Sequence, residues 1–188
     1  MYTSIETRFL RAAMTVTADQ YELRTYLRHL HVSPKGYLEA SNGHVAHRIQ
    51  LTWVEDNLEK FAADYPKGYL IPTRFLTPGN LAKSSTISFD FTAGVAYPKN
   101  LGIQPIPIPQ QEIGRIYPDL DRVIPGPNRI GEKTDQIGFN PEYLAPTQKA
   151  LKSPGCQFQM DGASASIRVH WYGIDPAEFV TVLMPMRF

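Results

Sequence analysis

Four of the five histidines lie close together in the sequence, so they are the first candidates for chemistry. His29 and His31 are two residues apart in an alternating segment and would share one face of a strand. His44 and His47 follow shortly after them. Several histidines together can bind zinc, but no cysteine or carboxylate stands beside these at ligand spacing. Strand histidines that only form hydrogen bonds are the commoner alternative, and we predict no metal site.

A pair of carboxylates, Asp119 and Asp121, lies in the stretch "YPDLDRV". Paired carboxylates can perform general acid–base catalysis, so these two residues are candidates for it. The sequence contains no Gly-x-Ser-x-Gly motif, no Walker loop and no Rossmann fingerprint. We therefore predict a protein that is not an enzyme and that needs no cofactor.

The composition narrows the class of protein further. The chain has 188 residues, a net charge of +1 and 43% hydrophobic residues, which is typical of a globular protein with a real core. Contact with nucleic acid would therefore need a local basic patch. One cysteine, no long apolar run and an N-terminus unlike a signal peptide predict a cytoplasmic protein.

The chain ends in the apolar run "TVLMPMRF", which is unusual because chain ends are mostly polar. A flexible, polarisable groove lined by methionine adapts to several apolar side chains. The alternative is a core strand whose last methionines fill a gap. The terminus alone does not separate these two interpretations.

The periodicity predicts the elements that hold these residues. Apolar spacing indicates a helix at about 5–16 with Ser4 as N-cap, a short helix near 73–77, and a helix at 140–152. The third helix has Asn140 as N-cap, Pro141 at its first position, and Pro146 as a predicted kink. Strands are predicted at 21–32, 37–41, 44–51, 68–71, 85–91, 93–97, 156–160, 166–172 and 179–185, with an extended edge segment at 103–109.

The order of these elements repeats. Three units, each with a helix and following strands, are predicted at about 1–54, 67–109 and 136–188, with a polar linker at 126–136. This pattern predicts an α+β fold in which antiparallel sheets carry helices on one face. A parallel sheet with crossover helices would contradict it.

Five stretches then show a resemblance to a known family. The segments "QYELRTYLRHLHV", "YLEASNGHVA" and "YPDLDRVIP" resemble parts of the bacterial DNA polymerase III beta sliding clamp, a processivity factor. The stretches "IGFNPEYLAPTQKALK" and "VLMPMRF" resemble the second half of the last domain of that clamp. The resemblance implies a clamp-like domain at 1–118, similar to the middle domain, and a half-domain at 119–188. The first clamp domain has no counterpart, so the chain resembles a truncated version such as a phage or prophage would carry.

The resemblance implies two binding surfaces. One would bind the short peptides that polymerases and other partners present to clamps, with the residues Leu27, Ser41, Gly43, His44, Pro118, Arg122, Val123, Val182, Met184, Pro185 and Met186. The other would contact the backbone of double-stranded DNA without sequence preference, through Arg8, Arg11, Arg74, Lys83, Lys149 and Lys152. Val45 and Ala46 stand where the family has Arg-Leu, which would widen the pocket and remove a charge.

The implied function is that of a sliding-clamp-like replication accessory protein. The alternative is an adaptor or inhibitor with the same fold that binds a protein partner without encircling DNA. Three units in a chain, against twelve helices in a bacterial ring, suggest a homotetramer closed head to tail. A monomer, or a dimer that covers the edge left by the missing half-domain, is the competing hypothesis.

Overall fold

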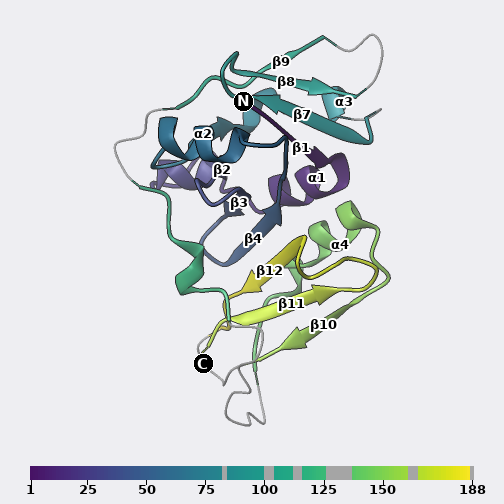
Figure 1. Cartoon of the computed structure of the whole chain (residues 1–188). Coiled ribbons are helices and arrows are strands. Elements are labelled where there is room, and N and C mark those ends of the chain that lie inside the picture. The colour runs from purple at the N-terminus through teal and green to yellow at the C-terminus, as the bar shows by residue number, and fades with distance from the viewer. Residues whose placement is uncertain (82–83, 100–103, 112–115, 126–136, 161–164, 187–188) are drawn as a thin grey trace.

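The structure is a computed structural model, and it describes residues 1–81, 84–99, 104–111, 116–125, 137–160 and 165–186. This part of the chain forms one five-stranded and one seven-stranded sheet, and all pairs of strands are antiparallel (Figure 1). The predicted fold class, α+β with antiparallel sheets and helices, is confirmed. The predicted linker at 126–136 and Lys83 lie outside the described residues.

The first unit consists of β1 (Tyr2–Glu6), α1 (Thr7–Thr15), β2 (His29–Val32), β3 (Tyr37–Ser41), β4 (Val45–Gln50) and β5 (Thr52–Trp53). The prediction that Ser4 caps the first helix is wrong, because Ser4 lies in β1 and pairs with Ser88. The N-cap is Glu6, whose side chain makes no capping hydrogen bond. The strand predicted at 21–32 forms only from His29, because the 3-10 helix η1 (Thr25–Arg28) precedes it.

Helix α2 (Asn57–Asp64), which we did not predict, lies between the first two units. Phe61 anchors it, because its ring is fully buried against Trp53 and Phe91. This helix lies in a segment with four charged residues between 55 and 60, and a single buried aromatic side chain stabilises it against the core.

The second unit consists of β6 (Tyr69–Pro72), the 3-10 helix η2 (Thr73–Phe75), α3 (Pro78–Leu81), β7 (Thr86–Asp90), β8 (Val95–Pro98) and β9 (Ile106–Pro107). The helix expected near 73–77 is thus a 3-10 turn, and the α-helix begins at Pro78, the residue expected to end it. Proline is favoured at the first helical position, where its missing N–H is not needed. The hairpin of β7 and β8 is confirmed, and β9 lies at the edge of its sheet as its prolines predict.

The third unit contains the 3-10 helix η4 (Pro141–Tyr143), α4 (Ala145–Leu151), β10 (Cys156–Gln159), β11 (Ile167–Trp171) and β12 (Phe179–Leu183). Asn140 caps the helical segment that begins with η4, as predicted. Its side-chain oxygen accepts a hydrogen bond of 3.0 Å from the Glu142 N–H. The kink predicted at Pro146 takes another form. The 3-10 helix η4 ends first, and α4 then begins at Ala145, with Pro146 in its first turn.

The seven-stranded sheet has the order β10-β11-β12-β4-β3-β2-β6, and the five-stranded sheet has the order β5-β1-β7-β8-β9. Strand β12 pairs with β4 from Phe179 opposite Ile49 to Leu183 opposite Val45. The first and third units therefore share one sheet. This pairing crosses the boundary predicted near residue 118, and the division into 1–118 and 119–188 stays a prediction.

The two faces of the seven-stranded sheet differ. His47, Ile49, Thr181 and Leu183 are buried on the face that α1 and α4 cover, and the two helices lie next to each other there (Figure 1). Because side chains alternate along a strand, Arg48 and Glu39, which lies opposite it on β3, point to the other face. Residues 116–125, which contain the 3-10 helix η3 (Leu120–Arg122), cross that second face; we call them the strap.

Candidate peptide-binding and DNA-binding surfaces

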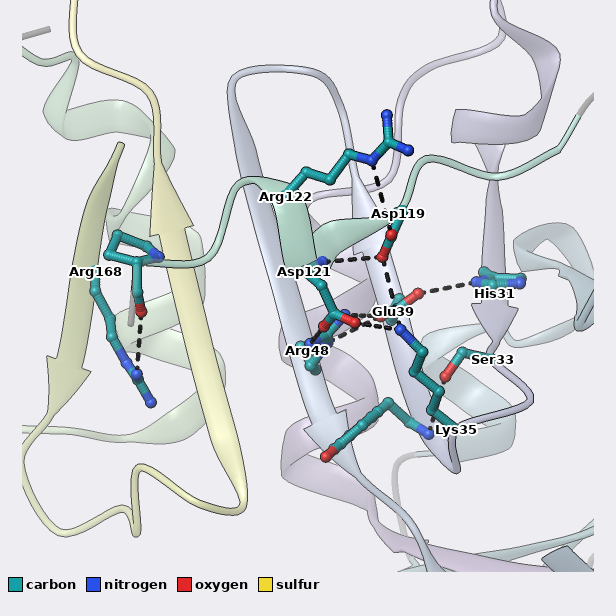
Figure 2. Close-up of polar contacts among 11 residues, drawn as sticks. His31, Ser33, Lys35, Glu39, Arg48, Asp119, Asp121, Arg122 and Arg168 are labelled. Atoms are coloured by element: carbon teal, nitrogen blue, oxygen red, sulfur yellow. Dashed lines mark hydrogen bonds and ion pairs between the residues drawn. The ribbon is translucent and has the colours of Figure 1, made fainter. Parts of the chain in front are cut away.

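Ion pairs attach the strap to the sheet (Figure 2). Asp121 contacts both Lys35 and Arg48, and these two cations lower the pKa of the Asp121 carboxyl group. The Arg48 Nη2 atom also lies 2.8 Å from Glu39 Oε1. The Nδ1 atom of His31 lies 3.0 Å from the other oxygen of Glu39. A continuous polar cluster thus joins β2, β3, β4 and the strap.

Apolar contacts hold the start of the strap. The ring of Tyr117 stacks on His31 with 4.5 Å between the ring centroids, and Tyr117 packs with Leu27 and Leu70 in a small core cluster. Leu27, a predicted peptide-site residue, is only 2% exposed. It therefore lies beneath this surface, while the neighbouring Pro118 is exposed on it.

The other end of the strap lies against the third unit. The Ser166 hydroxyl donates a hydrogen bond of 2.5 Å to the Val123 carbonyl oxygen, and Arg168 Nη1 donates one of 3.3 Å to the Pro125 carbonyl oxygen. The side chain of Val123 is half-buried and that of Arg122 is exposed, with its Nε atom 3.9 Å from Asp119 Oδ2. The strap thus connects the predicted residues of the first unit with those of the third.

The β3–β4 turn meets the last residues of the chain at one end of the sheet. The backbone N–H of Met184 donates a hydrogen bond of 2.9 Å to the carbonyl oxygen of His44. In the turn, the Gly43 N–H donates to Ser41 Oγ at 3.0 Å, and Gly43 adopts a φ of +91°, which favours glycine. Ser41, Gly43, His44 and Met184 are therefore brought together as predicted from the resemblance.

The predicted peptide-site residues at this end of the sheet differ in how exposed their side chains are. Met186 is 53% exposed, while Met184 and Pro185 are half-buried. Val182 is only 1% exposed and lies in the sheet below them, opposite Ala46. The surface consists of apolar side chains with polar groups around them, which is typical of a site for a protein partner.

Tyr143 is a further residue of this surface that the sequence reasoning missed. Its ring stacks on the exposed ring of His44, with a centroid distance of 5.3 Å and an angle of 7° between the planes. Next to it, the Met186 N–H donates a hydrogen bond of 2.8 Å to the Gly138 carbonyl oxygen. The position of an aromatic residue one turn after the Asn140 cap is the sequence feature that could have identified Tyr143.

The basic residues predicted to contact DNA differ in their exposure and in whether they form ion pairs or hydrogen bonds within the protein. The Arg8 Nε atom lies 2.8 Å from Glu6 Oε2, and Arg11 Nη2 donates a hydrogen bond of 2.6 Å to the Leu81 carbonyl oxygen. Lys149 and Lys152 are exposed at the end of α4, on the helix-covered side of the sheet. Arg74 is exposed in η2, with its guanidinium over the Phe75 ring.

A cavity of about 370 Å³ lies between α1 and α4 on the same side. Met14, Leu81, Pro146 and Ala150 give it an apolar lining, and Arg11 and Lys149 contribute the charged groups. The helix-covered side is thus partly apolar, which is less suited to phosphate than a continuous row of cations.

The histidines do not form a cluster. His29 contacts the Thr25 carbonyl oxygen, His31 contacts Glu39, and His44 stacks on Tyr143. His47 is fully buried and forms hydrogen bonds with Thr147 at 2.9 Å and with Thr181 at 3.0 Å. Among the residues that the structure describes, no group of three His, Cys, Asp or Glu side chains is arranged to hold a metal ion.

Comparison with known proteins gives a consistent result for the fold. No family model and no curated protein sequence matches the chain. The whole chain superposes on the DNA polymerase III subunit beta from Pseudomonas aeruginosa (TM-score 0.62, 15% identity, 67% of that chain). It also superposes on a beta sliding clamp from Caulobacter crescentus (0.63, 18%, 65%) and on the sliding clamp from Bacillus subtilis (0.64, 13%, 64%).

The chain spans about two thirds of the length of these clamps. Within the described part of the chain, no helix is long and apolar enough to cross a membrane. At identities this low the likeness concerns architecture, and it agrees with the two antiparallel sheets and the repeated units. The chain therefore has the fold of the bacterial sliding clamps.

Proposed function

We propose that this protein is a clamp-like accessory factor of DNA replication, without enzymatic activity. It binds short peptide motifs of polymerase-type partners at the surface formed by the β3–β4 turn, the strap and residues 184–186. It contacts double-stranded DNA loosely through the helix-covered side. The observation that supports this proposal best is the hydrogen bond of 2.9 Å from the Met184 N–H to the His44 carbonyl oxygen. It joins the stretch "YLEASNGHVA" to the stretch "VLMPMRF", and both resemble parts of the clamp.

The chemistry of the surface suits such a peptide. Met184 and Met186 offer flexible, polarisable side chains, and Tyr143 offers an aromatic face beside them. Arg122, which is exposed on the strap, adds a cation at the rim. Apolar anchors with a cationic rim match a short linear peptide that carries large apolar side chains and some acidic ones.

Titration with a labelled peptide of the clamp-binding type tests the proposal. The unmodified protein should bind it, and Met184→Ala should weaken binding by about 1–2 kcal/mol, as for an anchor at an interface. Met160→Ala is the matched control, because it removes an exposed methionine at the end of β10. If the folded protein binds none of these peptides, the assignment of this surface is wrong.

A second function is favoured by the state of the α1 arginines. Arg8 is paired with Glu6 and Arg11 is bound to the Leu81 carbonyl oxygen, so α1 offers little free positive charge to DNA. This observation favours an adaptor or inhibitor that binds the partner protein without encircling DNA. DNA binding distinguishes the two functions, because only the first requires it.

A further inference from the structure

The first two units share one pattern of strand contacts, and the described residues of the third unit show only part of it. In the first unit, β1 is contacted on one side by β5, which follows β4, and on the other side by β7. In the second unit, β6 is contacted on one side by Gln111, whose N–H donates 3.3 Å to the Leu70 carbonyl oxygen, and on the other by β2. Each leading strand thus has a neighbour on both sides.

The first two units complete each other in this way. The leading strand of the first unit, β1, pairs with β7 of the second, and the leading strand of the second, β6, pairs with β2 of the first. β2 and β7 are the strands that follow the helix of each unit. The exchange is reciprocal, as in a contact with two-fold symmetry.

In the third unit, the segment Ile137–Phe139, which contains only an isolated bridge at Gly138, takes the place of the leading strand, and the strand after the helix is β10. Gly138 forms a bridge with Met186, which corresponds to the contacts of β1 with β5 and of β6 with Gln111. In the described part of the chain, neither Ile137–Phe139 nor β10 has a strand on its other side. The third unit therefore has the two edges that the first two units cover for each other.

Burial also differs between the first two units and the third. On the reciprocally paired strands, the core residues Ile5, Leu30, Ile71 and Ile87 are at most 3% exposed. The corresponding residues of the third unit are only partly buried: Ile137, Phe139, Cys156 and Phe158. Phe139 and Phe158 contact each other at 5.1 Å, so the leading strand already lies over β10 as part of an incomplete core.

The charges and the backbone groups of these two edges also suit a contact between two copies of the chain. Residues 156–159, "CQFQ", carry no charge, and so do residues 137–139, so a two-fold contact brings no like charges together. Tyr172 N–H donates to the Gly155 carbonyl oxygen at 3.1 Å, with Cys156 opposite Trp171. Because bonded pairs alternate in antiparallel ladders, the N–H and C=O groups of Cys156 and Phe158 point away from β11.

We infer that the third unit pairs with the third unit of a second copy of this chain. In this homodimer, β10 of each copy pairs with Ile137–Phe139 of the other, as β2 pairs with β6 and β7 with β1. The contact completes two sheets and a shared core. It does not depend on the proposed binding of peptides or DNA.

Sedimentation equilibrium of the full chain tests this inference over a wide range of concentration. The chain should form dimers, and Cys156→Lys should raise the dissociation constant by about tenfold or more, since charges and lysine at an edge oppose pairing. Gln50→Lys is the matched control, because it adds the same charge at an exposed side chain of the interior strand β4. It should leave the dissociation constant unchanged.

Hydrogen exchange of the unmodified chain gives a second measurement that does not depend on the folding of a variant. The amides of Cys156 and Phe158, which point away from β11, should exchange more slowly as the concentration rises and dimers form. A monomer at all concentrations overturns the inference. So does an oligomer that forms without any change in the exchange of β10.

Discussion

His47 shows how a single residue connects two units of the molecule. It lies on β4, is fully buried, and forms hydrogen bonds with Thr147 of α4 and Thr181 of β12. Trp171 Nε1 donates to the same Thr181 hydroxyl at 2.8 Å. This buried network joins the first and third units, which is a structural role in place of the metal-binding alternative considered from the sequence.

The buried position of His47 predicts a pH dependence. Burial lowers its pKa from 6.5 to about 3, so the folded protein binds fewer protons than the unfolded chain between these values. The stabilising contribution is complete above pH 6.5 and is lost as the pH falls toward 3. In this window His47 should contribute a slope of up to about 1.4 kcal/mol per pH unit to the free energy of unfolding.

Urea unfolding of the His47→Gln variant at a series of pH values measures this slope. The variant should lose the part of the slope that His47 contributes, whatever its absolute stability. His44→Gln replaces an exposed ring near the same strand and should keep the slope of the unmodified protein. Equal slopes in all three proteins would contradict the assignment.

Among the structural elements, the strap determines the arrangement of the predicted peptide site. It is the element that carries Pro118, Arg122 and Val123, and its central contacts are the ion pairs of Asp121 with Lys35 and Arg48. Asp121 is partly exposed, so these pairs contribute little to overall stability. Their main effect is to hold the strap against β4.

Asp121→Asn should therefore affect peptide binding more than stability. We expect the free energy of unfolding to change by less than about 1 kcal/mol, as for exposed ion pairs. Peptide affinity should fall several-fold, because Arg122 and Val123 are no longer held in place. Since the cations lower the pKa of Asp121, acid should weaken the unmodified site as the pH falls through that lowered value.

Peptide titration and urea unfolding of the same sample separate the two effects. Asp64→Asn, at the exposed end of α2, is the matched control and should change neither. A variant that unfolds more easily in proportion to its loss of affinity would indicate that the strap only stabilises the fold.

For the molecule as a whole, the distribution of free charge predicts where DNA would bind. Lys149 and Lys152 are exposed on α4, whereas Arg8 is paired with Glu6. Replacing both lysines by alanine should weaken binding to duplex DNA. The slope of the logarithm of the association constant against the logarithm of the salt concentration should become shallower by roughly 2, about 0.9 for each phosphate contact. Arg8→Ala should change the salt dependence less.

Binding isotherms at several salt concentrations provide this test, with retention on circular compared with linear DNA. Retention on circular DNA but not on linear DNA indicates encirclement and supports the clamp-like function. If the protein binds the peptide but has no measurable affinity for DNA, the adaptor or inhibitor is the correct function.

The edges of the molecule also bear on the predicted ring. A head-to-tail tetramer would bring the β10 edge of one copy against the β9 edge of the next. These edges differ, because β9 includes Pro107, which has no N–H to donate to a neighbouring strand. The proposed two-fold contact instead pairs β10 of each copy with residues 137–139 of the other, and it leaves closure of a ring to the weaker β9 edge.

The sequence by itself determined the local elements of this protein. Alternation and turn residues predicted β3, β4, β7, β8 and the three strands of the third unit, and Asn140 predicted its cap. Through the resemblance, the motif "SNGH" and the run "VLMPM" predicted a peptide-binding surface, and this stays a prediction. These signals are local because periodicity and capping depend on residues a few positions apart.

Only the tertiary structure decided how these segments meet. The pairing of β12 with β4 joins residues such as His47 and Thr181, which are 134 positions apart, and several strand edges compete for such a pairing. Periodicity indicates which face of a strand is buried but not which strand lies next to it. For the same reason the partners of Arg8, Arg11 and Asp121, and the position of β10 at the end of its sheet in the described part of the chain, follow from the fold and not from the sequence pattern.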